Sequence, residues 1–248
     1  MCVDPSARAP RPPRTGGLAS SERLELVAED GNRIAARLAR TGEPGAPGVV
    51  VLPDVRGLHP YYEDLAEQLA EAGAHALAID PYGRTAGPGY RDEGFDFAPH
   101  RERTTDDHLR TDVRTAAATL RERGASPVFV LGFCFGGRAA LLQASQPGID
   151  GVIGFYGWPA RGDGSSPIEE ARRGLLRAPV LALFGGADRG ITPDQVAAYR
   201  EALAASGVPH EVVVYPGAPH SFFDRAMAEH AEACADAWRR VLAFLGVG

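Results

Sequence analysis

The sequence predicts an α/β fold, with a mostly parallel central sheet, helices on both of its faces and an N-terminal antiparallel hairpin. Short, continuous apolar runs alternate with stretches in which apolar residues recur every three or four positions. This is the pattern of buried strands alternating with amphipathic helices. The chain has 248 residues, of which 44% are hydrophobic, and its length fits one large domain, which we place at residues 21–248.

The N-terminal region divides into two parts. Residues 1–20 are rich in Pro, Arg and Ser and lack periodicity, so we expect a disordered tail. Residues 23–28 and 33–38 alternate in polarity on either side of Asp30-Gly31-Asn32, which is a turn signal. The two stretches therefore predict the antiparallel hairpin.

Six short apolar runs predict the remaining strands, because strands covered on both faces are continuously apolar. These runs are residues 48–52, 74–79, 128–131, 152–156, 180–184 and 211–215. Helices are expected between them, and a long helix is expected to close the chain near residues 224–245.

Two intervening helices have clear boundaries. The first carries Tyr61, Leu65 and Leu69 on one face and ends at Gly73. The second covers residues 109–120; it follows a capping-box-like Thr104…Asp107 and ends at Gly124.

Residues 82–104 form a long stretch with several glycines, prolines and aromatic residues. Loops of this length in a compact domain are usually functional or mobile. The stretch is therefore either part of a binding site, for instance a lid, or a solvated insertion.

Composition excludes several functions. The net charge is -6, and all basic residues are Arg spread along the chain, so no nucleic-acid surface is expected. No run of eighteen apolar residues and no N-terminal apolar segment occur, which predicts a cytoplasmic protein without membrane contact. The chain has no nucleotide-binding glycine motif and no metal-ligand spacing of Cys and His, so we expect neither a cofactor nor a metal.

The motif that carries chemistry is Gly132-Phe133-Cys134-Phe135-Gly136-Gly137, between a predicted strand and a predicted helix. This is the nucleophile-elbow pattern with Cys in the place of Ser. Glycines on both sides allow the strand and the helix to approach closely, and the sharp turn lifts the sulfur above the sheet. The amide of Phe135 then lies at a helix N-terminus, where it can stabilise an oxyanion.

Two partners follow in the order expected after such an elbow. Asp188 and His220 each come directly after a predicted strand, so both are expected at the carboxyl edge of the sheet with Cys134. His220 would serve as general base and Asp188 would orient its imidazole. The alternatives are a buried inert thiol, a turn-forming acid and an ordinary loop histidine. By contrast, Cys234 lies on the apolar face of the last helix, and Cys2 lies in the tail.

With Gly185-Gly186-Ala187-Asp188 and the run from Gly217 to Phe222, the elbow resembles the dienelactone hydrolase family of α/β-hydrolases over residues 22–245. The resemblance implies a Cys–His–Asp triad that opens lactones or cleaves esters through an acyl-thiol intermediate. It also implies an acidic residue that raises the pKa of the thiol, here Asp54 where Glu is usual. The amide of Val55 would be the second oxyanion donor.

Substrate-binding residues are less defined. Enzymes of this family that bind a carboxylate have Arg four residues after the His, but here Asp224 takes that place and Arg225 follows. An alternative anion clamp would consist of Arg84, Arg101 and Arg103, unless these are solvated surface charges. Tyr156 resembles the family's pocket-wall tyrosine, with core packing as the alternative.

These observations predict a hydrolase that opens a small lactone or ester, as a monomer or homodimer. A thiol esterase or acyl transferase with a larger, non-lactone substrate is the nearest alternative, because residues 82–104 would suit it. A non-catalytic sensor that uses the Cys134 thiol on the same fold is the other.

Overall fold

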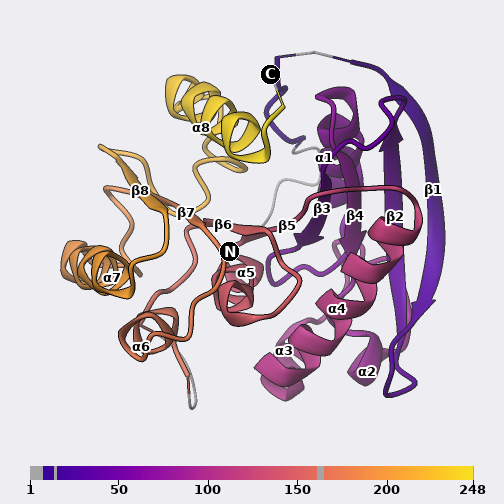
Figure 1. Ribbon diagram of the computed structural model, residues 1–248, viewed down its shortest axis with the longest axis horizontal. Coiled ribbons are helices and arrows are strands. Elements are labelled where there is room, and N and C mark those ends of the chain that lie inside the picture. The colour runs from indigo at the N-terminus through magenta and orange to yellow at the C-terminus, as the bar shows by residue number, and fades with distance from the viewer. Residues whose placement is uncertain (1–7, 14–15, 161–164, 248) are drawn as a thin grey trace.

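The computed structural model describes residues 8–13, 16–160 and 165–247. Within them an eight-stranded sheet has the order β1-β2-β4-β3-β5-β6-β7-β8 (Figure 1). From β4 to β8 neighbouring strands are parallel, whereas β2 pairs antiparallel with both β1 and β4. The strands are β1 (Leu18–Val27), β2 (Arg33–Thr41), β3 (Gly48–Leu52), β4 (His75–Ile79), β5 (Val128–Phe133), β6 (Gly151–Phe155), β7 (Val180–Gly185) and β8 (His210–Tyr215). The predicted fold class and its N-terminal hairpin are confirmed.

Helices cover both faces of this sheet, so that β3 to β7 are buried along their whole length. In Figure 1, α1 and α8 lie on one face and α4, α5, α6 and α7 on the other. The helices are α1 (Pro60–Glu71), α2 (Gly83–Ala86), α3 (Ala98–Arg103), α4 (Asp106–Glu122), α5 (Phe135–Leu142), α6 (Pro167–Arg172), α7 (Pro193–Ser206) and α8 (Ala231–Leu245). Because helices cover both faces of the sheet, these strands are apolar along their whole length.

Two helix starts differ from the sequence prediction. The capping box of α4 consists of Thr105 and His108, because the Thr105 hydroxyl accepts from the amide of His108 while the His108 ring accepts from the amide of Thr105. The expected pair Thr104…Asp107 is therefore one residue too early. The last helix begins at Ala231 instead of near residue 224, because residues 221–230 form successive turns.

Residues 82–104 contain α2 and α3 joined by turns, so the stretch is more ordered than a plain loop. Arg91 fixes its middle: the guanidinium pairs with buried Asp80 at 2.7 Å and donates to the carbonyl oxygen of Gly87 at 2.6 Å. The backbone amide of Arg91 also donates to Leu58, in the turn after β3. These contacts anchor the stretch to the carboxyl edge of the sheet.

The expected disordered tail over residues 1–20 is wrong in its described part. Strand β1 begins at Leu18, and Ala9 is buried against the domain. Gln68 of α1 donates to the carbonyl oxygen of Ala9, and Trp238 of α8 donates to that of Pro10. Hydrogen bonds from side chains to the backbone of this segment, together with the burial of Ala9, thus order it although its sequence has no periodicity. Residues 1–7 and 14–15 lie outside the described residues.

Glycines allow the turn between β5 and α5 to form. A Cβ on Gly132 would lie 2.0 Å from the carbonyl oxygen of Gly136, and one on Gly136 would lie 2.2 Å from that of Pro53. Since the obstructing atoms belong to the backbone, no side-chain adjustment can relieve either clash. The elbow, α5 and the segment after β3 are therefore in direct backbone contact.

We expect Gly132→Ala to destabilise the protein by about 3 kcal/mol or more, because overpacking against fixed backbone forces a main-chain shift. Gly42→Ala is the matched control: Gly42 is exposed, and an added Cβ meets nothing within 4 Å. Urea unfolding followed by circular dichroism measures both. A Gly132→Ala protein as stable as Gly42→Ala would contradict the close approach.

Candidate active site

Cys134 occupies the turn between β5 and α5. Its φ of 53° and ψ of -111° are strained for a non-glycine residue, and its amide donates to the carbonyl oxygen of Phe155 at 3.0 Å. The thiol is half-buried at the carboxyl ends of β5 and β6. The sequence motif therefore has the geometry of an elbow that presents its side chain above the sheet.

Strained backbone conformations occur at several residues near Cys134. Among the described residues, the non-glycine residues with positive φ are Cys134, Tyr156 and Ser221. They follow β5, β6 and β8, and Ser221 comes directly after His220. Such conformations cost roughly 1–3 kcal/mol each and cluster at functional sites. Three of them at one edge of the sheet mark this edge as the candidate site.

His220 and Asp188 meet at the same edge. Asp188 follows β7, and its Oδ2 lies 2.6 Å from Nδ1 of His220. Its Oδ1 accepts from the amides of Gly190 at 2.7 Å and Ile191 at 3.2 Å. With Nδ1 directed at a carboxylate, the neutral imidazole carries its proton there and leaves Nε2 as an acceptor. Nε2 is buried and has no hydrogen-bond partner among the described residues.

The charge of Asp188 is maintained by these hydrogen bonds. Burial alone would raise its pKa, but the hydrogen bond from His220 and those from Gly190 and Ile191 hold the pKa below its ordinary value. The carboxylate is therefore ionised at neutral pH and can stabilise an imidazolium.

Aromatic rings connect the imidazole to the elbow. The ring of Tyr156 lies 4.9 Å from that of His220, and the ring of Trp158 lies 4.8 Å from it. Tyr156 directly follows Phe155, which accepts the hydrogen bond from Cys134. The structure thus brings the predicted Tyr156 to the imidazole. The contact of Trp158 was not expected, although the run Tyr156-Gly157-Trp158 directly after a strand was a signal for it.

Two backbone amides, of Phe135 and Val55, were expected to be oxyanion donors. Phe135 is the first residue of α5, so its amide has no acceptor within the helix, and its hydrogen bond lowers the pKa of Cys134. In the described part of the chain, the amide of Val55 has no hydrogen-bond acceptor either. The Tyr82 hydroxyl donates to the carbonyl oxygen of Val55 at 2.9 Å, which fixes that turn.

The thiol of Cys134 is strongly perturbed. Burial, and after it the negative charge of Asp54, raise its pKa to about 12. The amide of Phe135 and the charges of Arg101 and Arg225 act in the opposite direction without cancelling this rise. The resting thiol is consequently neutral at pH 7.

Asp54 has a buried partner that the sequence did not predict. Both of its carboxylate oxygens lie 3.0 Å from Nε of Arg56, and Arg56 also contacts Asp224 at 2.5 Å. The only available signal was an isolated Arg two residues after the acid, within an apolar segment. Asp54 acts on the thiol through its charge while its oxygens bind Arg56.

The three arginines expected to form an anion clamp do not come together. Arg84 pairs with Asp112 at 2.5 Å and Asp30 at 2.6 Å, so its charge is already balanced by two carboxylates. Arg103 is exposed and donates to the carbonyl oxygen of Pro99 on its own helix. Arg101 is half-buried, forms no side-chain hydrogen bond or ion pair among the described residues, and lowers the pKa of Cys134.

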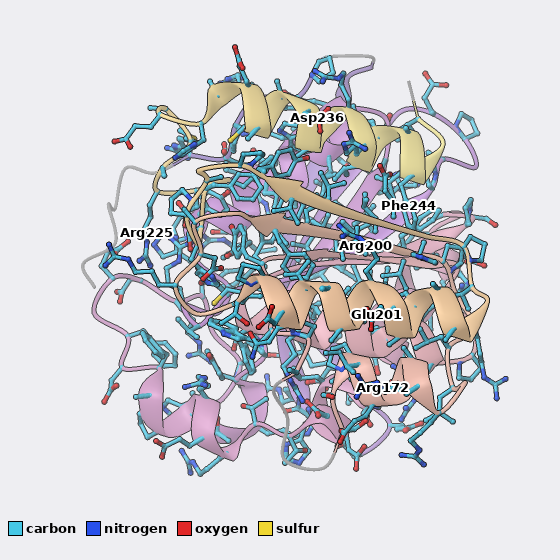
Figure 2. All side chains as sticks on the ribbon, turned by 90° about the vertical axis from the view of Figure 1, so that its left-hand side faces the viewer. Arg172, Arg200, Glu201, Arg225, Asp236 and Phe244 are labelled. Atoms are coloured by element: carbon cyan, nitrogen blue, oxygen red, sulfur yellow. The ribbon has the colours of Figure 1, made fainter. Side chains whose placement is uncertain are left out.

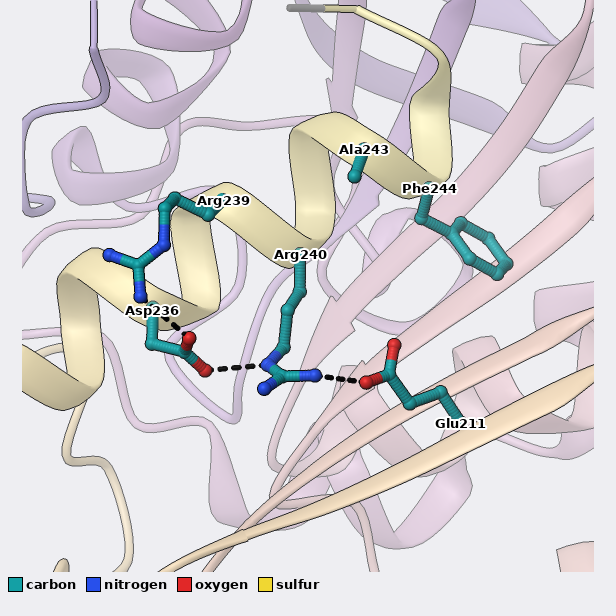
Figure 3. A pocket seen from close by; sticks show the side chains of 6 residues that line it. All are labelled: Glu211, Asp236, Arg239, Arg240, Ala243 and Phe244. Atoms are coloured by element: carbon teal, nitrogen blue, oxygen red, sulfur yellow. Dashed lines mark hydrogen bonds and ion pairs between the residues drawn. The ribbon is translucent and has the colours of Figure 1, made fainter.

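Neither of two surface cavities is lined by Cys134, Asp188 or His220. One of about 540 Å³ is lined by Glu211, Asp236, Arg239, Arg240, Ala243 and Phe244. Figure 3 shows Arg240 between Asp236 and Glu211, so its charges are already paired. Figure 2 shows Phe244 and Arg225 on opposite sides of the molecule. The other cavity, of about 500 Å³, surrounds the ion-paired Arg84.

Two kinds of feature are absent from the part of the chain that the structure describes. No group of three or more His, Cys, Asp or Glu among the described residues is arranged to hold a metal ion. Within the same residues, no helix is both long and apolar enough to cross a bilayer.

Comparison with known proteins gives a consistent result. The family model of the dienelactone hydrolase family matches residues 34–247. A "Putative carboxymethylenebutenolidase" of Synechocystis is 32% identical over 232 residues, which cover 88% of this chain and 93% of the relative. A "Probable 2-oxo-3-(5-oxofuran-2-ylidene)propanoate lactonase" of Bradyrhizobium is 31% identical, with coverage of 88% and 91%.

A solved structure agrees. The crystal structure of a "Putative Dienelactone Hydrolase" from Klebsiella pneumoniae superposes with a TM-score of 0.80. It is 28% identical in sequence, and the match covers 92% of this chain and 98% of that one.

The raised pKa of Cys134 predicts how the resting thiol reacts. Because the thiolate fraction grows about tenfold per pH unit below the pKa, alkylation by iodoacetamide should rise continuously from pH 6 to 9 without levelling. Mass spectrometry of the peptide containing Cys134 measures the rate. In Asp54→Asn the rate at pH 8 should increase, since a charge that opposes the thiolate is lost. A plateau below pH 8 in the unmodified protein would instead indicate a stable thiolate–imidazolium pair.

Proposed function

Because this chain belongs to the dienelactone hydrolase family and is a hydrolase of lactones or carboxylic esters, we propose that it works through a triad of Cys134, His220 and Asp188. The supporting observation is the juxtaposition at one sheet edge of a strained elbow and a hydrogen-bonded His–Asp pair whose Nε2 has no partner in the described structure. Nε2 is the atom that would accept the thiol proton.

Acylation begins when Nε2 of His220 takes the proton from Cys134. The sulfur then bonds to the substrate carbonyl carbon, and the π electrons of the carbonyl move to its oxygen. The amides of Phe135 and Val55 stabilise this oxyanion, and Asp188 stabilises the imidazolium. When the oxyanion collapses, the bond between the carbonyl carbon and the ring or ester oxygen breaks, and His220 protonates the departing oxygen.

Deacylation uses one water molecule. His220, again neutral, removes a proton from the water, whose oxygen attacks the thioester carbonyl carbon. Collapse of the second tetrahedral intermediate breaks the carbon–sulfur bond, and the sulfur recovers its proton from the imidazolium. The net change is one lactone or ester plus water to a hydroxy acid, or to an acid and an alcohol.

Asp54 would keep this nucleophile inactive between turnovers. Its charge favours the neutral thiol, so the thiolate would form only as substrate binds and the proton passes to His220. A neutral thiol resists oxidation and alkylation, because the thiolate is the reactive species.

An unsaturated lactone that carries a carboxylate is the substrate class we favour. The names of both relatives describe activity on lactones of this kind, a carboxymethylene-butenolide and an oxofuranylidene propanoate. Arg101, from α3 in the 82–104 segment, supplies a positive charge that reaches Cys134 and has no partner among the described residues. We propose that Arg101 binds the carboxylate of the substrate.

A thiol esterase or acyl transferase with a larger substrate is the alternative, since α3 carries Arg101, whose charge reaches Cys134, and a displacement of α3 would enlarge the site. A panel of enol-lactones and extended acyl esters at one enzyme concentration distinguishes the two. Selective turnover of enol-lactones supports the lactonase, and preference for extended esters supports the alternative. Rapid alkylation of Cys134 without turnover of any member would instead indicate a thiol sensor.

Replacing Cys134 by Ala should reduce kcat for p-nitrophenyl acetate and for an enol-lactone by at least about 10³-fold, because the bond-forming atom is lost. Cys234→Ala is the matched control, since that buried thiol donates to the carbonyl oxygen of Phe222 and is not part of the proposed triad. Its kcat should stay within about twofold of the unmodified enzyme. Equal rates for the two variants would refute the mechanism.

Arg101→Gln should raise KM for a carboxylate-bearing lactone about tenfold, equivalent to about 1.4 kcal/mol, while a neutral ester is unaffected. Arg103→Gln removes the same charge from an exposed position on the same helix. It should change neither KM. Steady-state kinetics at fixed ionic strength test both variants, and an equal loss for neutral and anionic substrates would argue against a carboxylate contact.

A further inference from the structure

We infer that Arg56 is a positioning residue, which joins the turn that carries Val55 to the segment that carries His220. The inference rests on the proposed function, because it concerns the alignment of the oxyanion donor with the general base. Asp224 is its partner on the histidine segment. Neither side chain has a role in the triad.

The contacts of Arg56 span the site. Its amide and its Nε both bind the carboxylate of Asp54, at 2.9 and 3.0 Å, in the turn that begins directly after β3. Its Nη2 contacts Asp54 at 2.9 Å and Asp224 at 2.5 Å. Asp224 lies four residues after His220 and 168 residues after Arg56. A single guanidinium therefore connects the two segments.

Tyrosines support this connection. The guanidinium carbon of Arg56 lies 5.2 Å from the ring centre of Tyr61 and 5.5 Å from that of Tyr62. The hydroxyl of Tyr61 donates to the carbonyl oxygen of Phe223, and that of Tyr62 accepts from the amide of Asp54. The same two segments are thus held twice, by the ion pairs and by hydroxyl groups at the start of α1. The cation lies among aromatic faces that favour it.

Stability alone does not explain this cluster. Arg56, Asp54 and Asp224 are each at most 6% exposed, and two carboxylates share one cation. Nη1 of Arg56 and Oδ1 of Asp224 are buried without a partner among the described residues. Buried ion pairs recover their desolvation cost only when every polar atom is satisfied, and apolar replacements are often no less stable. What the cluster provides is a fixed geometry at the site.

Loss of this geometry should affect the chemical step. The turn Asp54–Gly57 holds the amide of Val55. Without the Arg56 guanidinium the ion-pair link from this turn to the histidine segment is lost, and only the hydroxyl contacts of Tyr61 and Tyr62 remain between them. An oxyanion donor must lie within a few tenths of an ångström of its place to be effective. Since Arg56 is buried and makes no substrate contact in the proposed mechanism, kcat should fall while KM stays nearly constant.

The experiment compares kcat and KM for p-nitrophenyl acetate in four variants. We expect Arg56→Met and Asp224→Ala each to lower kcat at least tenfold, with KM changed less than threefold. Arg56→Lys, which keeps the charge but not the planar fork, should fall between Arg56→Met and the unmodified enzyme. The double variant should lose no more than the worse single variant, because the two residues act as one unit.

Arg110→Met is the matched control, because Arg110 also pairs with a buried carboxylate, that of Glu170, and lies away from the candidate site. Its kcat should stay within about twofold of the unmodified enzyme. Thermal unfolding shows that each assayed protein is folded, and if Arg56→Met does not fold, Arg56→Lys and Asp224→Ala carry the comparison. Unchanged kcat in folded variants, or losses that multiply in the double variant, would overturn the inference.

Failure of the proposed function gives a different result. Cys134→Ala is assayed in parallel. If it loses turnover while Arg56→Met keeps it, the triad stands and the role of Arg56 is wrong. If Cys134→Ala retains turnover, the triad is wrong, and the kcat of Arg56→Met still reports on the oxyanion turn, whichever nucleophile acts.

Discussion

The close approach of backbone at the start of α5 is the constraint on which the site depends. Gly132 and Gly136 allow the first turn of this helix to touch the segment after β3 at distances that no side chain would permit. Cys134, which lies between these two glycines, has the strained φ of 53°. The close approach also brings the amides of Phe135 and Val55 to the same end of the sheet. One steric condition thus places the proposed nucleophile and both proposed oxyanion donors.

The parallel sheet brings the segments of Asp188 and His220 to the edge at which Cys134 lies. Register pairs Leu52 with Gly132 and Gly185 with Tyr215, so the segments that follow these strands leave the sheet at one edge. Asp188 then needs only local hydrogen bonds to aim its carboxylate at the imidazole. Buried charges at this edge restrict how the connecting segments move relative to one another, since separating Arg56 from Asp224 would leave the carboxylate of Asp224 buried without its cation.

These features differ in how far the sequence predicts them. Periodicity located the strands, and the triad could be proposed from the sequence because each of its three residues lies in the segment that follows a strand. Helix starts were wrong by one residue at Thr105 and by several at Ala231, because cap chemistry and local turns decide them. The pair of Arg56 with Asp224 and the ion pairs of Arg84 could not be foreseen, since they join residues far apart in the chain. The partner of a charged side chain depends on its neighbours in the folded structure, and a single sequence does not show them.

The electrostatics of Cys134 follow from competition among these neighbours. A helix N-terminus, Arg101 and Arg225 favour a thiolate, yet burial and Asp54 outweigh them. A thiolate can therefore form only together with a compensating cation nearby, and the imidazolium of His220, itself stabilised by Asp188, is the one that the proposed triad supplies. Charge separation then becomes favourable when a carbonyl carbon accepts the sulfur electrons and two amides receive the oxyanion. In the proposed mechanism the substrate thus completes the charge balance, which links the reactivity of the thiol to the presence of its substrate.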